Sequence, residues 1–265
     1  MISVLRLTAR ELIHRRMGLV VCGLTLVLPA LLILSNQVQR DASGIFHGGH
    51  GLTLELQVQT VFEATLRMCS QIWSLIAAIA AALLFTSFLE RGWAELLLTK
   101  AQRRWTFLCT RFAAATAIYT VSVIVMLLIL AAYYGRAGWE LIPHGMWRSV
   151  LLITVSFAAL TSTAVLLAFS RSGMALPIFG VFLQLILSSI FAQHEMLKRA
   201  IDSDLGRKAI DLAYWVIPKH SELERMANSA IRETPIINTP QLWCTVAYTL
   251  ATLLVSIAWF QRKSF

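Results

Sequence analysis

The stretch FAAATAIYTVSVIVMLLILAAYY, residues 112–134, runs for 23 residues without a charged side chain. A helix needs about 20 apolar residues to cross the hydrocarbon core of a bilayer. Six stretches of this kind occur without Asp, Glu, Lys or Arg, at about residues 17–35, 72–89, 112–134, 149–169, 174–193 and 242–260. The sequence therefore predicts an all-α polytopic membrane protein with six transmembrane helices, which form a single transmembrane domain over residues 1–265.

The composition favours the same fold class. Charged residues make up 14% of the chain, whereas soluble domains contain about 25%. A cleaved signal peptide is the alternative for the first apolar stretch. Its 19 residues are long for that role and no A-x-A site follows, so we interpret it as a retained first helix.

The charge distribution predicts the orientation. If the N-terminus lies inside, the inner segments hold 12 basic and three acidic residues, whereas the outer segments hold 11 of each. Basic residues collect on the cytoplasmic side, so both termini are predicted to be cytoplasmic. Residues 2–16 are predicted to form an amphipathic helix in the inner headgroup layer. Anionic lipid accounts for this basic face, and no nucleic-acid partner is expected.

The largest outer segment, the helical loop of residues 194–241, is predicted to contain two amphipathic helices. Apolar residues recur at helical spacing over residues 197–216, and Pro218 ends that pattern. Ser221 stands three residues before Glu224, which predicts a capping box at the start of the second helix. We expect both helices to pack over the outer surface or dip into it.

Neither the histidines nor the cysteines predict a metal site. His47 and His50 lie in a glycine-rich loop and make half a site, with no further ligand nearby, so a flexible turn is the preferred interpretation. The four cysteines are far apart and are interpreted as free thiols. A Cys69–Cys244 disulfide stays open as an alternative, because both residues are expected near the outer boundary.

The sequence contains no recognisable motif that would supply the energy for transport. It has no P-loop, no H-E-x-x-H and no G-x-S-x-G motif, and the six stretches lack the ionisable residues that ion-coupled carriers use. Gln184, a hydrogen-bonding residue at depth, is interpreted as a helix-contact residue. A non-catalytic subunit without its own cofactor or metal is predicted, and its energy must come from a partner.

The inner loop of residues 90–111 is the predicted contact with that partner. Its centre is rich in helix formers, with acids early and basic residues late, which complements the helix dipole. An amphipathic helix here can anchor in the membrane or dock into a groove on a soluble subunit. The predicted coupling residues are Glu90, Gly92, Trp93, Glu95, Leu96, Leu97, Arg103 and Arg104.

This loop resembles that of ABC-2-type permeases, the membrane subunits of one class of ATP-binding-cassette exporter. The family commonly has an acid after span two, a Gly, a Glu-Leu-Leu-Leu stretch, a Pro-x-Ser-Arg turn and a Gly-Lys pair. The corresponding residues here are Glu90, Gly92, the stretch 95–99, Arg104 and the pair Thr110-Arg111. The chain departs from the pattern at Ala101, Arg103 and Thr110-Arg111. The stretch AYWVIPKHSEL, residues 213–223, is similar to one often seen between spans five and six.

The resemblance implies a permease in the bacterial inner membrane, paired with a second permease subunit as a homodimer or heterodimer. A separate ATPase subunit would bind ATP and Mg and would receive the loop as a coupling helix. The substrate would pass beside spans two and five, under the outer helices. Two alternatives remain open. One is a mechanical subunit that drives an outer, periplasmic partner protein, and the other is a membrane scaffold or stand-alone carrier without an ATPase.

Overall fold

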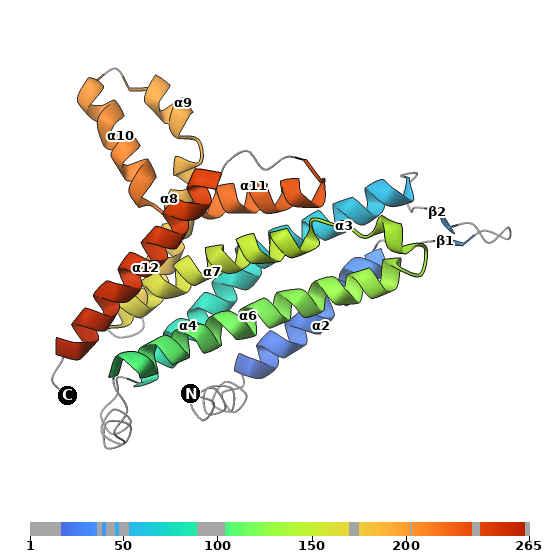
Figure 1. Cartoon of the computed structure of the whole chain (residues 1–265), viewed down its shortest axis with the longest axis horizontal. Coiled ribbons are helices and arrows are strands. Elements are labelled where there is room, and N and C mark those ends of the chain that lie inside the picture. Colours follow the sequence, from blue (N-terminus) through green and yellow to red (C-terminus); the bar gives the residue numbers. More distant parts are fainter. Residues whose placement is uncertain are drawn as a thin grey trace.

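Figure 1 shows the computed structural model, which describes residues 17–35, 39–40, 46–47, 53–88, 104–169, 175–201, 203–234 and 239–262. The described part is helical apart from two strands of two residues each, which pair in antiparallel fashion. The elements are α2 (Met17–Ser35), β1 (Gln39–Arg40), β2 (Phe46–His47), α3 (Leu54–Met68), η2 (Cys69–Trp73), α4 (Ser74–Phe88), α6 (Arg104–Tyr134), η3 (Trp139–Leu141), α7 (Met146–Ala168), α8 (Ala175–Phe191), α9 (His194–Arg199), α10 (Asp204–Val216), α11 (His220–Ile231) and α12 (Thr239–Arg262). The predicted all-helical fold class is confirmed.

Four helices are long and apolar enough to cross a membrane: Leu54–Thr86, Trp105–Tyr134, Trp139–Ala168 and Pro240–Arg262. They include the whole of the predicted third and sixth spans and most of the predicted second and fourth spans. The predicted fifth span is the shorter apolar helix α8, whose 17 residues extend over about 26 Å at 1.5 Å per residue. The predicted first span lies in α2. Both additional helices therefore occupy the predicted places, and within the described part of the chain four helices qualify as candidate spans by length and composition.

The apolar helices form one bundle and run up and down along a common axis (Figure 1). α2 and α6 begin, and α4 and α12 end, at the same end of the molecule (Figure 1). α7 lies in the middle, where it packs against α4, α6, α8, α11 and α12. Because α7 touches so many neighbours, it is the scaffold on which the candidate site is built.

The helix that contains the second span is unusual. α3, η2 and α4 run without a break, and η2 is a π-helix of five residues in the middle. Two side-chain hydroxyl groups stabilise this turn by donating hydrogen bonds to its carbonyl groups. The Tyr119 hydroxyl donates to the Cys69 carbonyl at 2.7 Å, and Ser74 Oγ donates to the Ser70 carbonyl. Single π turns inside α-helices are frequent at functional sites.

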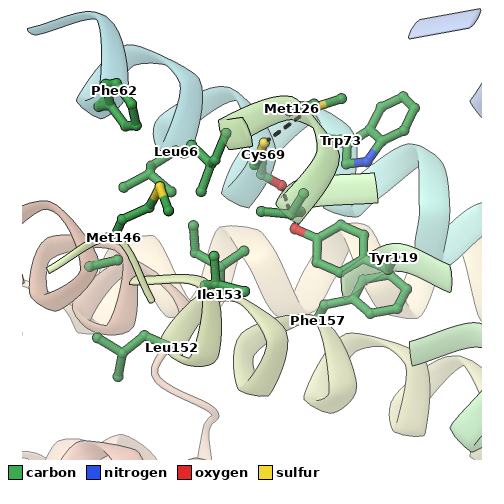
Figure 2. Packing of buried hydrophobic residues seen from close by; sticks show 14 of the residues in the cluster. Phe62, Leu66, Cys69, Trp73, Tyr119, Met126, Met146, Leu152, Ile153 and Phe157 are labelled. Carbon is green, nitrogen blue, oxygen red and sulfur yellow. Dashed lines mark hydrogen bonds between the residues drawn. The ribbon is translucent and has the colours of Figure 1, made fainter. Parts of the chain in front are cut away.

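The core lies between this long helix, α6 and α7. Figure 2 shows Phe62, Leu66 and Cys69 on one side and side chains of α7 on the other. Tyr119 stacks on Phe157 with a centroid distance of 3.9 Å. Cys69 Sγ is buried and lies 3.5 Å from Met126 Sδ. Cys69 and Cys244 are both free thiols, so the alternative of a Cys69–Cys244 disulfide is wrong.

The outer segment contains three helices, α9, α10 and α11, where two were predicted. The predicted capping box is also wrong, because α11 begins at His220 and has no side-chain cap. Tertiary contacts take the groups that the box would use. The Ser221 amide donates to Ser188 Oγ at 3.1 Å, and the Ser221 hydroxyl lies 3.2 Å from Ser189 Oγ.

Candidate functional site

α10 and α11 meet in a corner at residues 217–220, here called the tip, which is held inside the bundle. From this tip α10 projects away from the bundle, whereas α11 lies along it (Figure 1). α11 lies antiparallel along the first half of α7: Ser149 Oγ donates to the Ala227 carbonyl at 2.6 Å, and Ser156 contacts His220. From Gly145, which touches Ala230, to Ser156, α7 rises by about 16 Å. The tip therefore lies about halfway along α7.

His220 fixes the tip to two apolar helices. Its Nδ1 lies 2.8 Å from Ser156 Oγ of α7, and its Nε2 lies 2.9 Å from Gln184 Nε2 of α8. A neutral ring has one donor and one acceptor, so Nε2 accepts from the Gln184 amide while Nδ1–H donates to Ser156. Burial lowers the pKa of His220 to about 3, which keeps the ring neutral. Gln184 is thus the helix-contact residue that was predicted, and its partner is His220 at the tip.

Lys219 brings an amine to the same tip. Only 3% of this residue is exposed. Its Nζ donates to the Tyr214 carbonyl and lies 3.1 Å from the centre of the Tyr214 ring, a cation–π geometry. Its backbone amide donates to Thr245 Oγ1 of α12 at 3.2 Å. Burial lowers the pKa of Lys219 to about 8, because the surroundings disfavour the charged form.

A cavity of about 260 Å³ lies beside the tip, between the π-helix, α8 and α11. One part of its wall is polar and contains both Glu224 and His220, while the other part is aliphatic and aromatic. The lining residues are Ser70, Gln71, Ile72, Leu75, Phe182, Leu185, Ile186, Ser189, His220, Ser221 and Glu224. An amphipathic cavity of this kind can receive a small molecule by its polar and apolar ends together.

Polar contacts join the long helix to α11 at the outer edge of this cavity. The Gln71 amide donates to both carboxylate oxygens of Glu224 at 3.2 Å, and Arg67 Nε lies 3.8 Å from the same carboxylate. Arg232, the residue after α11, makes a two-point ion pair with Glu63 of α3. Polar contacts therefore hold the long helix and the α11 segment together beside the cavity.

The predicted coupling residues fall almost entirely outside the described part of the chain. Glu90, Gly92, Trp93, Glu95, Leu96, Leu97 and Arg103 lie there, as do residues 2–16 and His50. Arg104 is the first residue of α6, so the last part of the predicted loop 90–111 is helix that continues the third span. Arg111 is buried and donates to the Leu84 carbonyl at 3.1 Å, which ties α6 to α4. His47 belongs to β2.

Sequence reasoning missed the functional interest of Lys219 and His220. The six apolar stretches contain no acidic or basic residue, but the segment between α8 and α12 brings these two residues into contact with apolar helices. The signal was Pro218 between two amphipathic segments, followed at once by two polar, ionisable residues. A linear search for charges inside apolar stretches cannot find residues that enter the bundle from a loop.

No protein-family model matches the sequence, and no curated protein matches it. The likeness to ABC-2-type permeases therefore rests on the residues quoted above.

Proposed function

We propose that this chain is the permease subunit of an ABC-2-type exporter with six transmembrane helices and both termini in the cytoplasm of a bacterium. It would couple ATP hydrolysis by a separate ATPase subunit to export across the inner membrane, in a complex with a second permease subunit. The loop of residues 90–104 would act as the coupling helix. The chain itself would be non-catalytic, with ATP and Mg bound by the partner.

One observation carries this proposal. An amphipathic cavity lies between three elements. They are the π-helix η2, the predicted fifth span α8, and the start of α11 at the tip. The resemblance in the sequence implies a substrate path at the same three elements. Four apolar helices long enough to cross a bilayer support the membrane location.

The coupling role is tested by replacing Glu95 and Leu97 together with Ala in the complex of this chain with its ATPase. We expect normal membrane insertion but loss of transport and of ATPase stimulation, because the docking surface is removed. Gln102→Ala is the matched control, since it changes the same loop outside the predicted coupling residues. A double variant that still transports would refute the coupling role.

A second function is favoured by the arm formed by α9 and α10, which projects from the bundle (Figure 1). Large apolar residues of α10 are exposed, including Leu205 at 81% and Leu212 at 70%. In this alternative, the permease passes ATP-driven motion to an outer partner protein. Transport of a solute by the purified permease–ATPase complex, without any outer partner, would exclude this mechanical role.

A further inference from the structure

The charge of the cavity wall points to the kind of molecule that it accepts. Of the lining residues in the described part of the chain, Glu224 is the only carboxylate and none is a lysine or an arginine. His220 contributes a neutral ring whose two nitrogen atoms are both occupied by hydrogen bonds. Among the described lining residues, the charge of the polar part is therefore that of Glu224.

Arg67 balances that charge only weakly. Its side chain is 66% exposed, outside the cavity lining, and its Nε lies 3.8 Å from the carboxylate, whereas the Glu224 side chain is 15% exposed. Ion pairs with an exposed partner at this distance contribute little, because water screens the charge. The Gln71 amide satisfies the carboxylate oxygens without neutralising them. Glu224 can thus attract a second cation from the cavity side.

The opposite wall is suited to an apolar group. Phe182, Leu185 and Ile186 of α8 face Ile72 and Leu75 of the long helix across the cavity. Phe182 and Ile186 line the cavity and are 42% and 54% exposed, so this wall is open to the surroundings of the bundle, where lipid would lie. A ligand can reach it sideways with its apolar part on α8. Phe182 also offers a ring face to a cation.

We propose that this cavity binds an amphipathic organic cation, with its positively charged head at Glu224 and its apolar part against Phe182, Leu185 and Ile186. The proposal rests on the proposed function in one respect, because it names the substrate class of the export site. Binding itself requires only this chain and can be measured without the ATPase.

The test uses the full chain in nanodiscs of zwitterionic lipid, with binding to empty nanodiscs subtracted. The probes are phenylethyl-trimethylammonium and its uncharged tert-butyl analogue, which has the same shape. We expect the cation to bind about tenfold or more tightly than the neutral analogue, since only the cation is attracted by the charge of the partly buried Glu224 carboxylate. Equal binding of the two probes would overturn the proposal.

Three substitutions locate the site. Glu224→Gln should weaken binding of the cation by about tenfold and leave the neutral analogue unchanged. Arg67→Gln should strengthen binding of the cation, because it removes the competing charge. Glu63→Gln is the matched control, since it removes another carboxylate from the contact between α3 and α11 that does not line the cavity. Since Arg67→Gln acts in the opposite direction, general damage to the fold cannot imitate the pattern.

The outcomes separate this inference from the proposed function. If the cation binds through Glu224 but vesicles that contain the complete ATPase complex never accumulate it, the binding site stands and its role in export fails. If the complex exports another solute while Glu224→Gln and Glu63→Gln bind the cation equally, export stands and the cation site is refuted.

Discussion

Acid should detach the tip from α7 and α8, because the buried ring of His220 resists protonation. Burial lowers its pKa to about 3, against 6.5 for a ring in water. Below pH 6.5 the detached tip binds a proton that the docked tip cannot bind, so docking is lost as the pH falls from 6.5 towards 3. At 1.36 kcal/mol per pH unit, going from pH 7 to pH 5 should cost about 2 kcal/mol, or roughly 30-fold in the docking equilibrium.

Hydrogen–deuterium exchange of residues 217–231 at pH 5 and pH 7, corrected for intrinsic exchange rates, measures this equilibrium. His220→Gln is the control, since its amide can still pair with Gln184 but does not titrate. We expect weaker protection in this variant at neutral pH and no further loss at pH 5. The reasoning is refuted if the wild-type protection is equal at both pH values, or if the variant shows the same loss in acid.

Three further predictions use the same exchange assay or the unfolding temperature. Wild-type docking should strengthen as the pH rises above 8, because a detached Lys219 keeps its proton while the buried amine loses it, and Lys219→Met should abolish this dependence. Gly145→Ala should destabilise the fold by about 1–3 kcal/mol, because its Cβ would lie 1.7 Å from the Ala230 carbonyl oxygen, whereas Gly23→Ala meets nothing within 4 Å and should be tolerated. Glu63→Gln should cost less than about 1 kcal/mol, because it breaks a pair with an exposed arginine.

Apolar runs predicted most of the helices. The third span was placed at residues 112–134, and α6 includes all of it. Hydropathy could not reveal where a helix continues beyond the apolar run. α6 begins eight residues before the apolar run, at Arg104. The helix accommodates the charged Arg111 because its side chain donates to the Leu84 carbonyl. Such a contact between two helices leaves no local mark in the sequence.

The candidate site was only partly predictable. The Pro218 break and the amphipathic patterns on either side indicated two outer helices, and Gln184 was recognised as a contact residue. The position of the tip in the bundle depends on hydrogen-bonded pairs such as Ser156–His220, whose members are 64 residues apart in the sequence. Tertiary pairing of that kind also displaced the expected cap at Ser221, because α8 uses its amide and hydroxyl.

The π-helix has a consequence for the register of everything that follows it. A π turn holds one residue more than an α turn, and each residue of an α-helix advances the side chains by about 100°. Deleting one residue of η2 would therefore rotate α4 relative to α3 by roughly that angle. The face that packs Ala78 and Ala82 in the core would turn away, although no side chain of α4 had been altered. The extra residue at Cys69–Trp73 thus sets which face of the inner half of this helix meets α7.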